Sequence, residues 1–419
     1  MRRRFVLGGA GASLVVAGCD APARLASLPE KMRGSASFHG LPAGTRIVLD
    51  GSDDELLGRE ALVALRREVA YAGKNGVSDL APASYLAISG GGQNGAYGAG
   101  LLTGWSALGT RPEFKGVTGV STGALIAPFA FLGSGYDKAL ERFYTTISAR
   151  DVMVSRGLIS GVLGESFYDS TPLLHLIRGE MTKDMVAAIA REYTEKGRVL
   201  LIATTNLDVP VGVLWNIGAI AASGNPQAPE LIAKILLASA SIPGAFPPVM
   251  LDIEAGGERF QEMHVDGGTA AQVVFYPPSF GGKDFLGDSS PETVRLRRIV
   301  LKRPLRLYVI RNSRPGASLE TVDRSTLKIV GRAVSTLINT QGIGDLYQLY
   351  VIAQRDGIDY NVTWIPGSFT EKEGEPFDTG YMNRLYKVGR QAIANGTAWS
   401  KYPPGYNPTP LSQLTRTAG

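Results

Sequence analysis

The chain has 419 residues, of which 44% are hydrophobic, and a net charge of +5 with a pI near 9.1. This length can hold one large α/β domain or two ordinary ones, with a sizeable core. The charge is mild and no dense basic stripe with interleaved aromatics occurs, so we expect no nucleic-acid partner. Because Cys19 is the single cysteine, an internal disulfide and a cysteine-rich metal site are excluded. We expect no metal and no cofactor.

Residues 1–19 predict export and lipidation. Three arginines, Arg2 to Arg4, precede an apolar run that is too short to span a bilayer, as in a secretory signal. Val16-Ala-Gly-Cys19 resembles a bacterial lipobox, in which the cysteine is acylated and becomes the mature N-terminus. The arginines also resemble a twin-arginine signal, so the export route stays open. We therefore expect a lipoprotein of the bacterial cell envelope that faces the periplasm and is anchored to the inner or the outer membrane.

The next elements alternate between strand and helix. Residues 20–80 are expected to form a linker and then an amphipathic helix over 53–72. They are followed by a strand over 85–89, a glycine loop over 90–95, a helix over 96–108, a strand over 115–120, and a helix that begins at Thr122. Two consecutive strand–helix units imply a parallel sheet with helices on its faces.

The remaining chain continues this pattern. Further helices are expected over 137–147, 173–190, 229–239, 319–354 and 381–395, with Gly342 and Gly344 interrupting the fourth of these. Further strands are expected over 198–204, 263–266, 306–310 and 359–365. We therefore predict a three-layer α/β/α domain with a central, mostly parallel sheet over residues 81–400, followed by a loose tail over 401–419.

Ser121 lies where a buried strand meets a helix, in the sequence Gly119-Val-Ser-Thr-Gly123. A sharp strand-to-helix turn needs small neighbours and pushes the serine oxygen out at the top of the sheet. The start of the helix adds free N–H groups and partial positive charge beside that oxygen. The pattern favours an activated serine nucleophile.

The loop Gly90-Gly91-Gly92-Gln93-Asn94-Gly95 admits two interpretations. Its unobstructed backbone N–H groups, from Gly90, Gly91 and Gly92, can form an oxyanion hole for acyl transfer. The same residues also fit the dinucleotide-binding fingerprint of a Rossmann domain, with Glu113 near the expected distance for the acid that binds the ribose. However, Glu113 stands before a strand and does not end one, which weakens the second interpretation.

Two residues compete to be the base for Ser121. A Ser-His-Asp triad would use His264, with an acid such as Asp208 before it. Asp266 ends an apolar strand and enters Gly267-Gly268, where the chain can turn tightly around a projecting carboxylate. Such a carboxylate can serve as the base if burial raises its pKa toward neutrality. Because the whole chain has only three histidines, Asp266 is the favoured base.

In this order, the glycine loop, the Ser121 motif and Asp266-Gly-Gly resemble the patatin-like phospholipases. A fourth block, from Ala238 to Pro248, is similar to the segment that precedes the aspartate in that family. The resemblance covers residues 84–275 strongly and continues weakly to about 395. It departs at Asn94, where the family usually has Arg or Lys.

The resemblance implies a patatin-like fold and a Ser121–Asp266 dyad without histidine. It also implies an oxyanion hole from the Gly90–Gly92 backbone and metal-free hydrolysis of acyl esters in phospholipids or lysophospholipids through an acyl-enzyme. Besides the triad esterase and the dinucleotide-binding domain, a binding lipoprotein without turnover remains an alternative.

Overall fold

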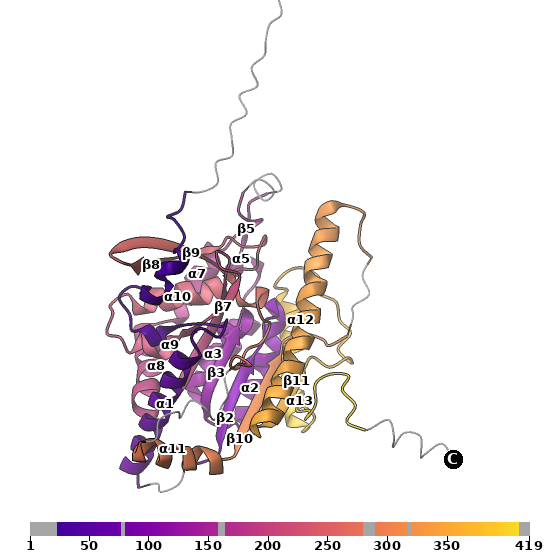
Figure 1. The fold of residues 1–419 in the computed structure, drawn as a ribbon. Coiled ribbons are helices and arrows are strands. Elements are labelled where there is room, and N and C mark those ends of the chain that lie inside the picture. Colours follow the sequence, from indigo (N-terminus) through magenta and orange to yellow (C-terminus); the bar gives the residue numbers. More distant parts are fainter. Residues whose placement is uncertain (1–22, 77–79, 158–163, 280–289, 317–320, 410–419) are drawn as a thin grey trace, which may run out of the picture.

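A computed structural model describes residues 23–76, 80–157, 164–279, 290–316 and 321–409. Its centre is a nine-stranded sheet with helices on both faces (Figure 1). Five neighbouring strands run parallel, in the order β6 (Val199–Asn206), β3 (Phe114–Val120), β2 (Ala83–Ile88), β10 (Leu305–Arg311) and β11 (Asp359–Trp364). The mostly parallel three-layer α/β/α architecture predicted from the sequence is confirmed.

Four further strands are antiparallel to their neighbours. β7 (Val211–Asn216) and β1 (Arg46–Val48) extend the sheet beyond β6, whereas β9 (Glu258–Asp266) pairs with the end of β6 on its β3 side and carries β8 (Val249–Ala255). The sequence pattern indicated only the last part of β9. It missed β1, β7 and β8. β1 is only three residues long, whereas the Gly256-Gly257 turn between β8 and β9 and the short connection between β6 and β7 were usable hairpin signals. A separate small pair is formed by β4 (Val154–Ser155) and β5 (Tyr168–Asp169).

One face of the sheet packs against a large cluster of helices. Residues of these helices join Leu86 and Ile88 of β2 in the main hydrophobic core. The helices are α2 (Gly95–Ala107), α3 (Thr122–Leu132), α4 (Asp137–Thr145), α5 (Ala149–Val152), α7 (Thr171–Glu180), α8 (Lys183–Lys196), α9 (Ile217–Ala221), α10 (Ala228–Ser239) and α13 (Thr379–Ala394).

The opposite face is covered by α1 (Asp54–Lys74) and α12 (Thr326–Asp356). Leu57 of α1 packs on Leu201 and Ala203 of β6, and Leu349 of α12 packs on Leu307 of β10. A further helix, α11 (Pro291–Lys302), packs against α1. The resulting layers are visible in Figure 1, where α12 runs along one side of the sheet.

The prediction that Gly342 and Gly344 interrupt the long helix is wrong, because α12 is continuous from Thr326 to Asp356. Gly342 faces the body of the protein, where a Cβ atom would lie 3.1 Å from Arg311 Nη1 and 3.2 Å from Gln272 Cβ. The usual cost of glycine in a helix is therefore offset by close tertiary packing at this position.

The region expected to be a linker makes defined contacts with the domain. Arg24 forms an ion pair with Asp208, Ser37 bridges to Glu254, and β1 adds to the sheet beside β7. Cys19 and the rest of the expected signal sequence lie outside the described residues, as do residues 410–419 of the tail. None of the described helices combines the length and the apolar character needed to cross a bilayer.

Candidate active site

The register of β6 brings Ser121 and Asp266 to one place. Along one edge of β6, Val120 at the end of β3 pairs with Ala203, and Asp266 at the end of β9 pairs with Thr204. The parallel strand β3 therefore stops where the antiparallel strand β9 begins to use the same edge. Ser121 and Asp266, which are far apart in the sequence, become neighbours because β6 holds both strand ends.

Ser121 has the backbone of a strained turn, with φ 54° and ψ −124°. Such angles are rare outside glycine and persist only when the surroundings enforce them. Gly123 provides the necessary room, because a Cβ atom there would lie 2.2 Å from the carbonyl oxygen of Ile88. The side chain of Ser121 is therefore presented at the C-terminal edge of the sheet, beside the first turn of α3, as the sequence motif predicts.

The end of α10 fixes both halves of the site. The Ser121 N–H donates to Ser239 Oγ over 3.0 Å, and Ser239 Oγ donates to the Ala203 carbonyl over 2.6 Å. The Asp266 N–H donates to the Ser241 carbonyl over 2.9 Å. In the sequence, this segment is marked only by its similarity to the family, and nothing about Ser239 or Ser241 indicates that they position Ser121 and Asp266.

Asp266 is buried, with 5% of its surface exposed. Its Oδ1 accepts a hydrogen bond of 2.7 Å from the Gly268 N–H, whereas Oδ2 has no hydrogen-bond partner among the described residues. Burial raises the pKa of Asp266 to about 7, against the opposing influence of the Ser121 hydroxyl and the Gly268 N–H. A carboxyl group with this pKa can accept a proton near neutral pH and release it again.

The glycine loop leaves two amides free. The Gly90 N–H donates to the Gln272 carbonyl over 3.1 Å. Gly91 and Gly92 have positive φ angles of 154° and 56°, and their N–H groups have no acceptor among the described residues. A Cβ atom on Gly91 would lie 2.2 Å from the Asn312 carbonyl oxygen, so only glycine fits there. Gly91 and Gly92 are thus available as donors to an oxyanion, while Gly90 is engaged.

Two residues that the sequence analysis did not select hold this loop in place. The buried Asn312 donates from Nδ2 to the Ser89 carbonyl and accepts from the Gly98 N–H. Gln272 accepts from Gly90 through its carbonyl and donates from Nε2 to the Gly268 carbonyl. The position of Asn312 directly after strand β10 was a usable signal, because sites gather at the carboxyl ends of parallel strands.

Ser121, Asp266 and the glycine loop line one cavity of about 370 Å³. Residues from β10 and α12 line it as well, namely Arg311, Ser335, Ile338, Asn339 and Gly342. A smaller apolar recess of about 40 Å³ also reaches Ser121 and is lined by side chains such as Leu125, Phe143, Leu173 and Phe246. The arrangement therefore combines a larger cavity of mixed polarity with a small apolar recess, and both reach Ser121.

The residues of the competing interpretations lie elsewhere. His264 is fully buried, and its two ring nitrogens contact Thr204 Oγ1 and a Glu262 carboxylate oxygen. Asp208 is bound to Arg24 through two hydrogen bonds of 2.8 and 2.7 Å. Glu113 precedes β3, at the opposite end of the sheet from the glycine loop, and forms an ion pair with Lys196. None of these three residues lines the cavity that contains Ser121.

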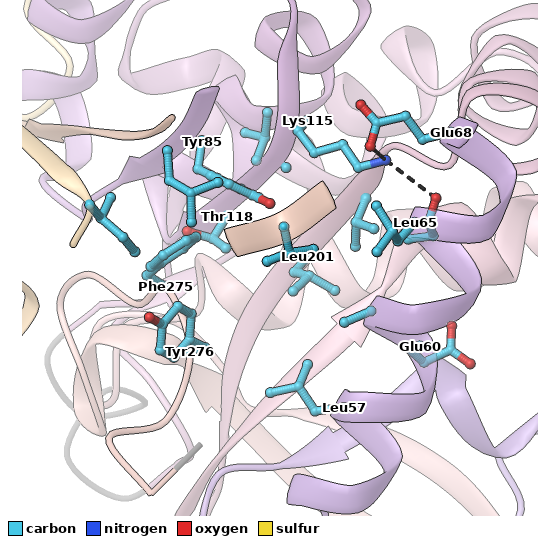
Figure 2. A pocket seen from close by; sticks show the side chains of 18 of the residues that line it. Leu57, Glu60, Leu65, Glu68, Tyr85, Lys115, Thr118, Leu201, Phe275 and Tyr276 are labelled. Carbon is cyan, nitrogen blue, oxygen red and sulfur yellow. Dashed lines mark hydrogen bonds and ion pairs between the residues drawn. The ribbon is translucent and has the colours of Figure 1, made fainter. Parts of the chain in front are cut away.

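A second cavity of about 190 Å³ lies between α1 and the sheet. Figure 2 shows its apolar lining, with Leu57 and Leu65 of α1 facing Leu201 and Phe275. Its charged groups are paired, since Lys115 reaches Glu68 over 2.8 Å and Glu68 also binds Arg303. It contains neither Ser121 nor Asp266. In the described part of the chain, no group of three or more His, Cys, Asp or Glu side chains is arranged to hold a metal ion.

Comparison with known proteins gives three findings. Residues 86–277 match the family model described as patatin-like phospholipase. Among solved structures, the chain is similar to VipD from Legionella pneumophila, with a TM-score of 0.36 and 11% sequence identity, over 75% of this chain and 66% of VipD. No curated protein matches the chain.

The family match covers the stretch from β2 to the segment that follows Asp266, and therefore includes the glycine loop, the Ser121 turn, the end of α10 and Asp266. The chain therefore carries a patatin-like phospholipase domain at residues 86–277.

Proposed function

We propose that this protein hydrolyses acyl esters of phospholipids or lysophospholipids, with Ser121 as the nucleophile and Asp266 as its base. The match of residues 86–277 to the patatin-like phospholipase model supports lipid acyl-hydrolase activity. The observation that carries the residue assignment is the meeting of a strained serine with a buried carboxyl group of pKa about 7 in one cavity. The unpartnered Oδ2 of Asp266 provides the acceptor that the serine proton needs.

In the first step, Ser121 Oγ attacks the ester carbonyl carbon while Asp266 accepts the hydroxyl proton. The carbonyl electron pair moves to its oxygen, which accepts hydrogen bonds from the Gly91 and Gly92 amides. When the tetrahedral intermediate collapses, the alcohol leaves with the proton from Asp266, and Ser121 remains acylated. Water then attacks the acyl-enzyme with Asp266 again as base, which releases the fatty acid and restores the serine.

The two cavities beside Ser121 suit the two ends of such a substrate. The apolar recess around Phe143 and Phe246 fits the beginning of an acyl chain, and the larger cavity, with Arg311 and Asn339 among its lining residues, fits the glycerol and head group. A lipid anchor on Cys19 would hold the enzyme at a bilayer and raise the local concentration of substrate.

Labelling with a fluorophosphonate probe tests the nucleophile. We expect wild-type protein and the Ser134→Ala variant, which alters an exposed serine, to be labelled, and Ser121→Ala to remain unlabelled. Labelling of a folded Ser121→Ala protein at the same rate would refute the assignment. Mass spectrometry of mixed bilayers after incubation with wild type or Ser121→Ala then identifies the lipids consumed.

Two further variants separate the dyad from a histidine triad. We expect Asp266→Asn to abolish ester hydrolysis and His264→Ala to retain most of it per folded molecule. The opposite pattern would favour a triad through His264. For the anchor, metabolic labelling with palmitate should mark wild type and not Cys19→Ala, and equal label on both proteins would exclude Cys19 as the lipidation site.

A further inference from the structure

Arg311 is a buried cation in the cavity that contains Ser121. It is the last residue of β10, and 3% of its surface is exposed. Among the described residues that line this cavity, Arg311 is the one basic side chain. Strand β10 lies beside β2, whose end continues into the glycine loop, and β2 lies beside β3, whose end carries Ser121. With adjacent strands about 4.8 Å apart, the ends of β10 and β3 are separated by about 10 Å.

The guanidinium of Arg311 is only partly satisfied by the protein. Nε donates to Ser313 Oγ over 2.7 Å, and Nη2 donates to the Asn339 carbonyl over 3.3 Å. Nη1 is buried and has no hydrogen-bond partner within the described chain. Asp345 lies close enough to influence Arg311, but its Oδ2 accepts the amides of Gln272 and Val273.

A buried charge without a bonded counter-ion is costly, and arginine cannot discharge itself by losing a proton under ordinary conditions. A ligand that supplies the missing anion would offset this cost. The substrate cavity is where that anion would enter, because Arg311 and Ser121 line the same space. Asn94 contributes no charge there because its amide is neutral, and its side chain is bonded to Tyr381 and Glu373.

We propose that Arg311 binds the phosphate group of the lipid substrate whose acyl ester is attacked by Ser121. The proposal rests on the proposed function for the identity of the substrate. In a glycerophospholipid, a few covalent bonds separate the phosphate from the nearest acyl ester, which suits the spacing of the two strand ends. Guanidinium groups bind phosphate through charge-assisted hydrogen bonds, and the unused Nη1 is the donor for one of them. Arg311 therefore selects phospholipids over neutral glycerides.

The test compares two substrates that differ in the phosphate. Wild type, Arg311→Gln and Arg311→Lys are assayed with dihexanoylphosphatidylcholine and with dihexanoylglycerol, both below the concentration at which they form aggregates. For Arg311→Gln we expect kcat/KM on the phospholipid to fall about 10- to 100-fold, mainly through KM, because one charge-assisted hydrogen bond is lost. Hydrolysis of the glyceride should change less than about 3-fold, and Arg311→Lys should recover part of the phospholipid activity.

Arg314→Gln is the matched control, because Arg314 lies on the same segment but does not line the cavity. It should leave the ratio of the two activities unchanged. Equal losses on both substrates in Arg311→Gln, or no loss on either, would overturn the proposal. The first of these results would mean that Arg311 serves the structure, by holding α12 through its bond to the Asn339 carbonyl.

A binding experiment keeps this test separate from the test of hydrolysis. Ser121→Ala and the double variant Ser121→Ala/Arg311→Gln are titrated with dihexanoylphosphatidylcholine, dihexanoylglycerol and inorganic phosphate. We expect the phospholipid to bind the single variant at least about 10-fold more tightly than the double variant, with no such difference for the glyceride. If inorganic phosphate binds as tightly as the phospholipid, the site is one for free phosphate and the lipid assignment is wrong.

Discussion

The cavity beneath α1 and the cavity at Ser121 are both bordered by buried charged side chains, but they differ in how those side chains are satisfied. Beneath α1, Lys115 is paired with Glu68, Glu68 is paired with Arg303, and carbonyl groups complete the shell around the lysine. At the serine, Asp266 Oδ2 and Arg311 Nη1 are buried without a partner in the described chain.

This difference separates groups that stabilise the fold from groups that remain available to a ligand. A buried charge whose bonds are all made by the protein has nothing left to offer a substrate. A buried polar atom that the protein leaves unbonded costs stability until a substrate or a proton satisfies it. The apolar character of the cavity beneath α1 would make it attractive as a binding site, yet of these two cavities it is the one at Ser121 that holds the buried atoms without a hydrogen-bond partner in the described chain.

The strongest test of the comparison is Asp266→Asn, which should change activity and stability in opposite directions. We expect a loss of about 10³-fold in kcat, because the general base is removed. Since burial raises the pKa of Asp266 to about 7, the unfolded chain loses this proton at lower pH than the folded protein, so stability falls as the pH rises from about 4 to about 7 and then levels off. The variant should therefore be more stable than wild type at pH 8, by up to about 4 kcal/mol in the free energy of unfolding, with a smaller gain at pH 5.

Differential scanning calorimetry at the two pH values measures this gain. Asp252→Asn, in the β8–β9 hairpin, is the matched control and should show neither effect. A variant that loses activity and also loses stability at pH 8 would contradict the role assigned to Asp266.

In the cavity beneath α1, Glu68→Gln should lower the stability of the protein and leave its activity unchanged. The substitution leaves Lys115 and Arg303 without their buried carboxylate, and we expect a loss of about 3 kcal/mol in the free energy of unfolding. Activity per folded molecule should stay at the wild-type value, because this cavity does not contain Ser121. Chemical denaturation together with active-site titration checks both statements, and a selective loss of kcat in fully folded protein would assign the cavity a catalytic role.

A third effect concerns the pH dependence of kcat/KM on an uncharged ester. If Asp266 must be ionised to act as base and its pKa is about 7, activity should rise about 10-fold between pH 6 and pH 8 and then level off. Stopped assays with dihexanoylglycerol at constant ionic strength give this profile. A profile that is flat across this range would exclude Asp266 as the titrating base.

The smallest expected effect comes from filling the cavity beneath α1. Ala61 of α1 lines this cavity, and Ala61→Leu should add apolar contacts there and raise stability by about 1 kcal/mol. Thermal unfolding measures the gain, with Ala61→Ser as a polar comparison. A large loss of activity in Ala61→Leu would show that the empty volume itself serves the reaction.

Much of the site could be predicted because its motifs are local. The turn at Ser121 and the glycine loop each depend on neighbours a few residues away, so their glycines are visible in the sequence. Asp266 could be proposed because a strand and an Asp-Gly-Gly turn mark it. The predicted break in the long helix was wrong because the packing of Gly342 is not local: it lies against Arg311, which comes from strand β10.

The remaining features depend on pairing between distant segments. No pattern in the sequence shows that the Gly90 N–H is taken by the Gln272 carbonyl, or that Ser239 holds the Ser121 amide. The antiparallel strands β7 and β8, in contrast, pair with their neighbours in the chain, and the Gly256-Gly257 turn between β8 and β9 was an overlooked local signal. The role inferred for Arg311 likewise follows from what the folded protein leaves unbonded at this residue.

The shared edge of β6 also has a consequence for how activity appears during folding. Strand β3 can pair with β6 while β9 is still unpaired, and in that state Ser121 has its turn but Asp266 is elsewhere. Closing the long intervening segment is slow compared with forming local helices. Recovered esterase activity should therefore lag behind recovered helical signal when the protein is refolded, and newly made chains remain catalytically silent until the sheet is complete.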